Sequence, residues 1–587
     1  MKLRIILCYI LFASSIMSNA QTRSMKERPI IYQVFTRLFG ANSSHCVANG
    51  NSTQNGVGKM ADFTQKALEQ IKDLGCTHIW YTGIIEHATQ TDYTEFGIAK
   101  DHPAVVKGLA GSPYAIKDYY DINPDLATKV PLRMKEFEAL VRRTHKAGLK
   151  MIIDFVPNHV SRQYGSDSKP AGVKDLGEGD NNKVDFDANN NFYYIPGQQF
   201  SPKFSLNDST GSAYIEMPAK ATGNDCFNAY PERNDWYETV KLNYGVDYTH
   251  GRTCHFDPVP DTWTKMRDIL FFWAGKGVDG FRCDMAEMVP CEFWGWVIPQ
   301  IKAEHPDINF IAEVYNPNEY RNYIHNGHFD YLYDKVGLYD TLRTVVNGNS
   351  ASAITQCWQS VDDIQPHMLN FLENHDEQRI ASPFFAGSAK KGRPALLVSA
   401  LMRSNPFMVY FGQELGEPAA DSEGFSGADG RTTIFDYWTV PTISRWRNGG
   451  KFDGRRMRED EKELQAFYRT VLTLCNKEKA LREGEFFDIM YANYDNAMMN
   501  THRQYAFLRK SGKDLILVVA NFDERGAHTS IKIPAHAFDY LKMPQSANAR
   551  PAVDLLTGEK ENITLNENTT IDITIPALNG KVIKIRL

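Results

Sequence analysis

The sequence predicts an α/β protein built on a parallel (β/α)8 TIM barrel, with a subdomain inserted after the third barrel strand and a C-terminal antiparallel β-sandwich. Short apolar runs alternate with longer amphipathic segments along most of the chain, which is typical of βα units around a parallel sheet. One long polar segment interrupts the alternation, and short alternating runs replace it towards the C-terminus. These three observations together carry the prediction.

Eight apolar runs are candidates for the barrel strands, and helical patterns separate most of them. The first run reads PIIYQVFTRLF and the third reads KMIIDFV. In a barrel of this kind the active site lies at the C-terminal ends of the strands. The eight predicted strands begin at Pro29, His78, Lys150, Gly280, Asn309, Phe329, Met368 and Phe407.

Helical periodicity is clear in the segments between these strands. In residues 61–75, apolar side chains recur on one face, and Gly75 follows the last of them. Residues 134–150 repeat this pattern, with Gly148 as the terminator. A glycine in this place ends a helix in the left-handed conformation. Each predicted helix therefore has one apolar face to pack on the barrel.

Composition divides the chain into domains. We expect residues 27–158 and 251–484 to form the catalytic barrel in two parts, and residues 485–587 to form the sandwich. Residues 159–250 are polar and rich in Gly, Asn and Asp, and they are too many for a βα loop. We expect them to form an inserted subdomain beside the mouth of the barrel.

Residues 1–20 have the pattern of a secretory signal peptide. Lys2 and Arg4 precede an apolar run at residues 5–12, and SNA at residues 18–20 offers small residues before a cut. The alternative is a membrane anchor, but the run is shorter than the ~20 residues that a span needs. We expect an exported protein, periplasmic or extracellular, with no membrane span in the mature chain.

Charge and cysteine content argue against two other classes of protein. The 65 basic and 71 acidic side chains give a formal net charge of -6, so no basic surface for nucleic acid is expected and a neutral substrate fits. Eight cysteines follow the predicted signal peptide without any CxxC spacing, which argues against a zinc-thiolate site. Cys76 and Cys283 lie in apolar runs that suit buried thiols.

Three acidic residues stand at the ends of predicted strands. Asp284 ends the fourth strand, Glu313 the fifth and Asp376 the seventh, so a barrel would bring them together on one face. Glycoside hydrolysis with retention needs two carboxyl groups about 5 to 5.5 Å apart. For one acid alone a surface salt bridge is the simpler explanation, but three acids at matched strand ends favour an active site.

Four segments resemble the four signature segments of the α-amylase family, glycoside hydrolase family 13, and they stand in the family's order. They are DFVPNH at 154–159, GFRCD at 280–284, IAEVY at 311–315 and FLENHD at 371–376. The runs IIYQVFTRLF, PDTW and GQELG add to the resemblance. It implies a retaining hydrolase of α-glucosidic bonds.

The resemblance also implies roles for individual residues. Asp284 would be the nucleophile, Glu313 would protonate the leaving oxygen and then activate water, and Asp376 would hold sugar hydroxyls. Arg282 lies two residues before Asp284, on the same side of the strand, where its charge would keep Asp284 ionised. Asp154 would orient Arg282.

Further side chains are expected to contact the substrate. By the resemblance, His159 and His375 would bond sugar hydroxyls beside the cut. Tyr114, in SPYAIKDYYD, resembles the family tyrosine that stacks on the sugar ring. Trp236 and Tyr237 would extend that platform or, as aromatic side chains more often do, pack in a core.

The sequence departs from many starch-digesting members after the nucleophile. Glu287 and Met288 stand where those members carry Lys-His, which removes a cationic contact at the leaving-group side. The stretch DMAEMVPCEFW is more similar to the cyclomaltodextrinase and neopullulanase branch. Preference for starch, for short maltooligosaccharides or for pullulan stays open at this point.

Calcium is a second open question, and no organic cofactor is expected. Asn158 matches a position that often ligates calcium in the family. Residues 175–191 add oxygen donors of the kind that calcium takes, although a solvated polar loop explains them equally well.

We therefore expect a retaining α-glucoside hydrolase that cleaves α-1,4 bonds of a starch-like glucan or a maltooligosaccharide by double displacement. A glucanotransferase with the same site is an alternative, because the sequence does not reveal the acceptor. A non-catalytic glycan-binding protein is a third interpretation, but such proteins typically lose one or more of the acids, and all three stand here.

Overall fold

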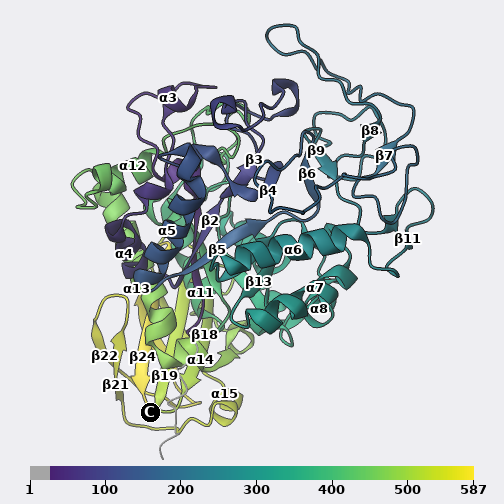
Figure 1. Cartoon of the computed structure of the whole chain (residues 1–587). Helices are drawn as coiled ribbons and strands as arrows, with labels where there is room; N and C mark the ends of the chain where they lie inside the picture. The colour runs from purple at the N-terminus through teal and green to yellow at the C-terminus, as the bar shows by residue number, and fades with distance from the viewer. Residues whose placement is uncertain (1–26) are drawn as a thin grey trace, which may run out of the picture.

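Eight parallel strands close into a barrel in the computed structural model, which describes residues 27–587 (Figure 1). The predicted signal peptide lies outside the described residues. The strands follow one another around the barrel in chain order, and the last pairs with the first. They are β1 (Ile30–Phe35), β2 (His78–Thr82), β5 (Lys150–Phe155), β12 (Gly280–Cys283), β13 (Asn309–Ala312), β14 (Tyr331–Tyr333), β15 (Met368–Phe371) and β16 (Phe407–Tyr410).

All eight predicted runs contain a barrel strand, but the first was predicted too long. β1 ends at Phe35, and Thr36–Phe39 form the short helix α2 with all four side chains buried. A short apolar run fits a buried strand and a buried helical turn equally well. In the helical turn, the Arg37 guanidinium donates to the carbonyls of Ala110 and Ile434 outside the barrel wall.

Helices cover the outside of the barrel, as the amphipathic segments predict (Figure 1). The predicted helix of residues 61–75 is α4 (Gln65–Asp73), and that of residues 134–150 is α5 (Arg133–Lys146). Gly75 has φ +101°, and a Cβ there would lie 2.8 Å from the backbone nitrogen of Thr473. Glycine is therefore required both by conformation and by the close approach of α13 (Glu459–Lys477).

Further helices after the barrel strands include α6 (Asp261–Gly275), α7 (Cys291–Glu304), α8 (Tyr320–His325), α9 (Asp340–Val346), α10 (Ala353–Ser360), α11 (Gly392–Leu401) and α12 (Pro441–Arg447).

Two excursions leave the C-terminal ends of the strands. After β2, the strands β3 (Ile85–His87) and β4 (Ile116–Ile122) form an antiparallel pair that the sequence pattern does not predict. After β5, the chain enters the polar insert, where β6 (His159–Ser161) pairs with β9 (Thr239–Lys241). Figure 1 shows this insert projecting to one side of the barrel, with long connections between short strands. These excursions form the walls of the site described below.

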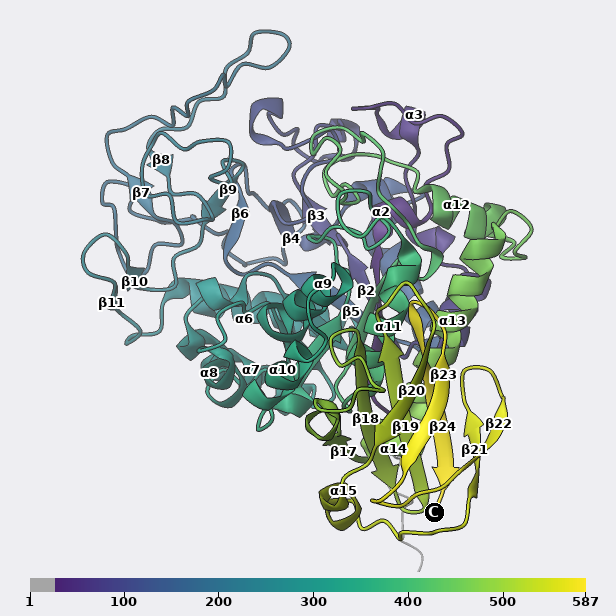
Figure 2. The same cartoon turned by 180° about the vertical axis from the view of Figure 1, so that it is seen from behind.

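The C-terminal residues form an antiparallel β domain below the barrel (Figure 2). Its main sheet has six strands, and β20 (Ala527–Lys532) pairs with β23 (Thr570–Ile575) in a second sheet. The predicted alternation of buried and exposed residues is clear in β23. In order, the six-stranded sheet contains β17 (Glu485–Asp488), β18 (Gln504–Ser511), β19 (Asp514–Asn521), β24 (Asn579–Arg586), β21 (Arg550–Asp554) and β22 (Lys560–Ile563).

Two smaller expectations concern membranes and thiols. Within residues 27–587, no helix is both long enough and apolar enough to cross a bilayer. Cys76 and Cys283 are buried thiols, as predicted.

Candidate active site

The barrel ladder holds two of the three predicted acids in place. Asp284 follows β12 directly, and its amide donates to the carbonyl of Phe155 at 2.9 Å. Glu313 follows β13, and its amide donates to the carbonyl of Cys283 at 3.2 Å. The hydrogen bonding of the sheet thus continues up to both acids. Their backbones are as fixed as the barrel itself, which suits a preorganised site.

Arg282 joins these acids through one guanidinium. It is fully buried, and its Nη1 donates to Asp284 Oδ1 at 2.6 Å. Its Nη2 lies 2.8 Å from Glu313 Oε2, and Nη1 lies 3.7 Å from Asp154 Oδ1. Asp284 and Glu313 therefore stand side by side at the two ends of a single planar group. This is the convergence that the strand-end positions predict.

The charge balance around Arg282 differs from the simple expectation that it keeps Asp284 ionised. Burial raises the pKa of Asp284 well above its usual range, the Arg282 charge opposes that shift, and the Glu313 charge adds to it. One guanidinium thus faces the three carboxyl groups of Asp284, Glu313 and Asp154. The ionisation of Asp284 therefore depends on both the Arg282 charge and the Glu313 charge.

Glu313 is held by two further donors. The amide of Met285 donates to Glu313 Oε2 at 2.8 Å, and the Tyr315 hydroxyl donates to Glu313 Oε1 at 2.6 Å. Met285 adopts the left-handed conformation with φ +44°, which is strained for a residue with a side chain. That conformation aims its amide at the carboxylate beside the nucleophile.

Asp154 lies beneath Arg282 and does not line the cavity. It accepts from Trp80 Nε1 at 3.1 Å, and it is 6 % exposed. Burial raises its pKa to about 6, against the opposing charge of Arg282. The predicted role of orienting Arg282 agrees with this position.

Asp376, His375 and Tyr114 form a second group across the cavity. The side chain of Asp376 is 42 % exposed, and its Oδ2 lies 3.2 Å from His375 Nε2. The Tyr114 hydroxyl lies 2.5 Å from the same nitrogen, while Gln33 Nε2 lies 2.9 Å from Nδ1. Burial lowers the pKa of His375 well below its usual range, so the ring is neutral and serves as a hydrogen-bonding group.

The insert supplies another wall through His159 and Trp236. Their rings lie 5.4 Å apart, and both line the cavity. Burial, with help from Lys241, lowers the pKa of His159 to about 3, so this ring is also neutral. Tyr237 is 3 % exposed and packs on Phe204 inside the insert. For Tyr237 the packing interpretation is the right one.

A cavity of about 480 Å³ collects these side chains at the mouth of the barrel. Its walls come from the barrel strand ends, the β3–β4 excursion, the insert and the loop after β16. Carboxylates, neutral imidazoles and aromatic faces in one cleft are what a neutral sugar needs. Among the lining residues are Tyr114, His159, Trp236, Asp284, Glu313, Tyr315, Lys335, His375, Asp376 and Arg431.

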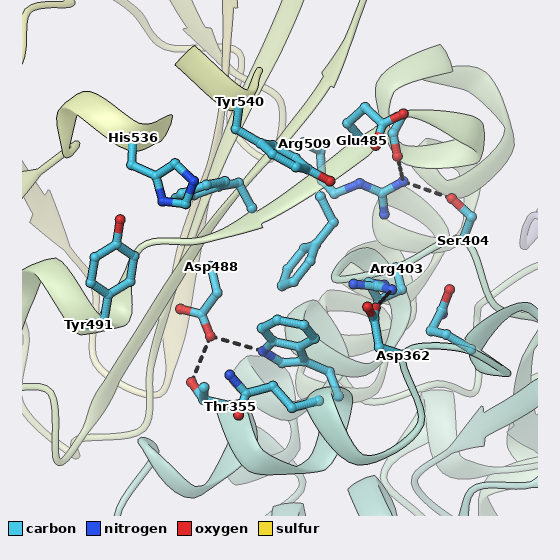
Figure 3. A pocket seen from close by; sticks show the side chains of 16 residues that line it. Thr355, Asp362, Arg403, Ser404, Glu485, Asp488, Tyr491, Arg509, His536 and Tyr540 are labelled. Carbon is cyan, nitrogen blue, oxygen red and sulfur yellow. Dashed lines mark hydrogen bonds and ion pairs between the residues drawn. The ribbon is translucent and has the colours of Figure 1, made fainter. Parts of the chain in front are cut away.

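A larger cavity of about 740 Å³ lies between the barrel and the C-terminal domain (Figure 3). Two of its three acids are already committed: Asp488 accepts from Thr355 at 2.6 Å and from Trp358 at 2.9 Å, and Asp362 pairs with Arg403. These carboxylates are bound to donors within the protein. Volume alone therefore does not locate the chemistry, and the smaller cavity holds the candidate active site.

Comparison with known proteins identifies the family of this chain. The model of the alpha amylase catalytic domain matches residues 47–463, and that of the alpha amylase C-terminal all-beta domain matches residues 494–586. The chain belongs to the α-amylase family. The family prediction made from the four segments is confirmed, as are the barrel and the C-terminal β domain.

Individual relatives of the family are distant. "Alpha-amylase 3" of Dictyoglomus thermophilum is 24% identical over 481 residues, which is 78% of each chain. A cyclomaltodextrinase of Bacillus sp is 24% identical over 76% of this chain and 66% of its own. The crystal structure of a noncanonic maltogenic alpha-amylase from Thermotoga neapolitana is 20% identical with a TM-score of 0.58, covering 95% of this chain and 99% of that one. This last likeness concerns the fold alone.

The surroundings of Asn158 do not fit the calcium ion that the family resemblance implies. Asn158 Oδ1 accepts from Lys241 Nζ at 2.8 Å, and the same ammonium lies 2.6 Å from Asp225 Oδ1. Lys241 is buried on β9, which pairs with β6 beside Asn158. A divalent cation here would face a buried positive charge that already uses its oxygen ligands. The prediction of Asn158 as a metal ligand is therefore corrected: its side-chain oxygen binds the Lys241 ammonium. The sequence does not reveal this contact, because the two residues are far apart along the chain.

Two residues beside the acids were missed. Tyr315 follows Glu313 by two positions in IAEVY, so its side chain turns to the same side of the extended segment. Glu287, noted only as a departure from the family pattern, accepts from the amides of Tyr315 at 2.6 Å and Asn316 at 3.0 Å. It thereby fixes the loop that presents the Tyr315 hydroxyl. The spacing of two would have been enough to find Tyr315, whereas Glu287 required coordinates.

Proposed function

We propose that the chain hydrolyses α-1,4-glucosidic bonds of starch-like glucans or maltooligosaccharides with retention of configuration. In this proposal Asp284 is the nucleophile, Glu313 the general acid and base, and Asp376 a ligand of sugar hydroxyls. The observation that carries it is the single guanidinium of Arg282, in contact with Asp284 at 2.6 Å and with Glu313 at 2.8 Å. That arrangement holds two carboxyl groups close enough to act on the same glycosidic bond, as a retaining glycosidase needs.

The first step forms a covalent glycosyl-enzyme. An Asp284 oxygen forms a bond to the anomeric carbon as the bond from that carbon to the glycosidic oxygen breaks. A proton passes from the Glu313 carboxyl group to the departing oxygen, so the leaving sugar departs as an alcohol. Arg282 balances the charge that Glu313 then carries.

The second step releases the product. Glu313, now a carboxylate, takes a proton from a water that attacks the anomeric carbon, and the bond to Asp284 breaks. Two inversions at one carbon give net retention, so an α-linked substrate yields an α-anomer. If another sugar takes the place of water, the same step becomes transfer.

The remaining side chains support sugar binding in this proposal. His159 and His375 are neutral, so neither ring places a fixed charge beside the sugar, and the two nitrogens of His375 already face Gln33, Tyr114 and Asp376. Tyr114 holds His375 at 2.5 Å, and the exposed side chain of Asp376 faces the cavity. A neutral ligand is bound here by directed hydrogen bonds and ring faces.

Anomer-resolved proton NMR of freshly cleaved maltooligosaccharide tests the stereochemistry. The first signal to grow should belong to the α-anomer, and initial growth of the β-anomer would refute the double displacement. Asp284→Asn should abolish turnover, while the matched variant Asp362→Asn in the larger cavity should keep full activity. An undiminished rate in Asp284→Asn would remove the proposed nucleophile.

Product analysis with maltotriose separates hydrolysis from transfer. Glucose and maltose alone indicate that water is the acceptor, whereas longer oligosaccharides indicate a glucanotransferase. Running starch, pullulan and cyclodextrins in the same assay determines which glucans are cleaved.

Export is a separate proposal that rests on the sequence of residues 1–20. Mass spectrometry of the protein recovered from a secreting host should show a chain that begins at Gln21. An intact Met1 on the cell-associated protein would contradict it.

A further inference from the structure

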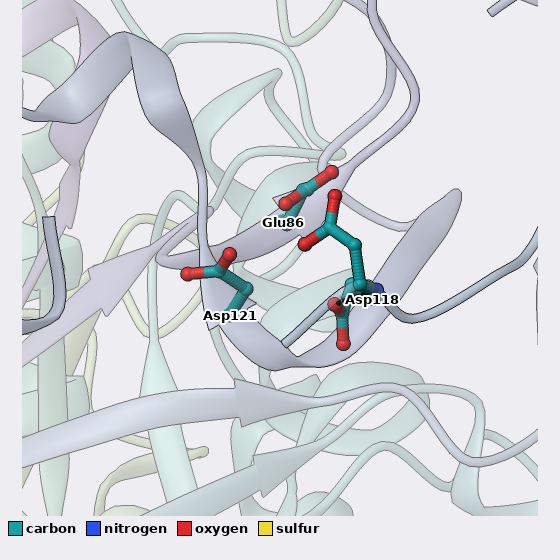
Figure 4. A group of neighbouring side chains, drawn as sticks. Glu86, Asp118 and Asp121 are labelled. Atoms are coloured by element: carbon teal, nitrogen blue, oxygen red, sulfur yellow. Dashed lines mark hydrogen bonds between the residues drawn. The ribbon is translucent and has the colours of Figure 1, made fainter. Parts of the chain in front are cut away.

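Four acidic side chains meet outside the active-site cavity. Glu86 lies on β3, Asp118 and Asp121 on β4, and Asp167 near the start of the insert. One carboxylate oxygen from each residue lies within 4.8 Å of the others. Figure 4 shows the carboxylates of Glu86 and Asp118 close together, with Asp121 beside them. This acidic cluster is a feature distinct from the Arg282 site.

Three of the four members are buried. Glu86 and Asp118 are each 1 % exposed, and Asp121 is also buried, whereas Asp167 is at the surface. The strand register brings Glu86 and Asp118 directly opposite each other on the antiparallel pair. Like charges placed opposite each other destabilise such a pair. The sheet therefore carries a cost that some other group must compensate.

Protein donors compensate only part of the cluster. Asp118 accepts from the amides of Tyr120, Asp167 and Ser168 at 2.8 to 3.1 Å. Asp121 is paired with Arg133, whose Nε lies 2.9 Å from both of its oxygens. One guanidinium against four carboxylates leaves the cluster strongly acidic.

Glu86 is the member that protein donors leave out. Its Oε2 is buried and accepts no hydrogen bond within the described part of the chain. The nearby cation Lys117 is committed elsewhere, because its ammonium pairs with Asp101 at 3.1 Å and also donates to Ala99. A buried carboxylate without a partner is costly, so this oxygen points to a ligand that the protein itself does not supply.

We propose that Glu86, Asp118, Asp121 and Asp167 form a binding site for a calcium ion. All four offer hard carboxylate oxygens, and calcium accepts several of these in flexible geometry. Glu86 would supply the oxygen that lacks a donor, while Asp118 and Asp121 keep their existing hydrogen bonds and each share one oxygen. The ion would tie the β3–β4 pair to the first part of the insert. Tyr114 lies two residues before β4, so the same tie would steady one wall of the cavity.

In the competing account, Glu86 carries a proton and the cluster binds no calcium ion. Burial and the charges of Asp121 and Asp118 raise the pKa of Glu86 to about 9, so in the absence of a cation Glu86 is a neutral acid at pH 7. Replacement by Gln, which has the same shape as a neutral Glu, then separates the two accounts. A proton site tolerates that change, whereas a calcium site loses a ligand.

The test is calorimetric titration of calcium chloride into the chelator-treated full chain, with a thermal melt at each calcium level. We expect one equivalent of calcium to bind and the melting temperature to rise with calcium concentration. Glu86→Gln should weaken calcium binding by about tenfold or more. Glu95→Gln, an exposed glutamate on the same excursion, is the matched control and should bind calcium like the parent.

Two outcomes overturn the proposal. If the parent shows neither binding heat nor a melting shift, and Glu86→Gln melts no lower than the parent, the cluster holds a proton. If Glu86→Gln binds calcium as tightly as the parent, the ion sits elsewhere. Should Glu86→Gln fail to fold, Asp167→Asn at the surface replaces it and should weaken binding too. No substrate enters this experiment, so its result is independent of the proposed hydrolase activity.

Discussion

The Tyr315 hydroxyl makes the sharpest prediction about acid catalysis. Tyr315→Phe removes the donor that lies 2.6 Å from Glu313 Oε1 and keeps the ring. A hydrogen bond to a charged group contributes about 1.5 to 3 kcal/mol, and ~1.4 kcal/mol of activation free energy is a factor of ten in rate. If the whole bond serves to orient Glu313 towards the leaving oxygen, kcat/KM on maltotriose should fall by about 10- to 100-fold.

The assay compares two leaving groups. Maltotriose needs its glycosidic oxygen protonated, whereas the fluoride of α-maltosyl fluoride departs without a proton. Tyr315→Phe should therefore reduce kcat/KM strongly on maltotriose and only slightly on the fluoride. Tyr491→Phe, an exposed tyrosine of the C-terminal domain, is the matched control and should change neither value. An equal loss on both substrates, or no loss on either, would refute the assignment of Tyr315 to the acid step.

Three further predictions concern stability. Gly75→Ala should lower the free energy of unfolding by about 1 to 3 kcal/mol, because φ is +101° and a Cβ would meet the Thr473 nitrogen at 2.8 Å; an unchanged urea midpoint would contradict the close packing. Burial lowers the pKa of His78 to about 3, so the unfolded chain takes up a proton first as the pH falls below about 6.5. The stability advantage of the parent over His78→Gln should then shrink by up to about 1.4 kcal/mol per pH unit between pH 6.5 and 3, and a difference that does not vary with pH in urea titrations would exclude this. Lys241→Met should lower the melting temperature, corresponding to a loss of about 1 to 3 kcal/mol, because Asn158 and the partly exposed Asp225 lose their shared cation; calorimetry showing an equal or higher melting temperature would contradict this.

The barrel was predictable because its signal is local. Apolar runs such as those of β5 and β16 are bounded by helical segments, and each needs only its own composition to be read as a buried strand. The boundary after Phe35 was not predictable in the same way. Just beyond it, Arg37 donates to the carbonyls of Ala110 and Ile434 in distant loops, and no local pattern contains that information.

The site residues also differ in how far local sequence predicts them. Asp284 and Glu313 follow from strand-end position alone, since a closed parallel barrel gathers those ends, whereas Asp376 lies five residues beyond the end of β15. The sharing of Arg282 among three acids follows from strand register, which cannot be deduced from the sequence. Lys241 beside Asn158 is the clearest case, because 83 positions separate two atoms that lie 2.8 Å apart.

The β3–β4 excursion shows what a short strand hides. Ile85–His87 spans three residues, too few for a periodic signal, so the opposition of Glu86 and Asp118 was invisible before the fold was known. In the sequence these acids are ordinary charged residues of a loop. In the structure they are buried neighbours.

Trapping the covalent intermediate tests the central claim most directly. A 5-fluoro maltosyl fluoride combines a good leaving group with a fluorine that slows formation and breakdown of the glycosyl-enzyme, so the ester accumulates if it exists. Mass spectrometry of the digested protein should then find the sugar mass on the peptide containing residues 280–284, at Asp284. A stoichiometric label on Glu313 or on any other side chain, or turnover to the β-anomer without any label, would contradict the account.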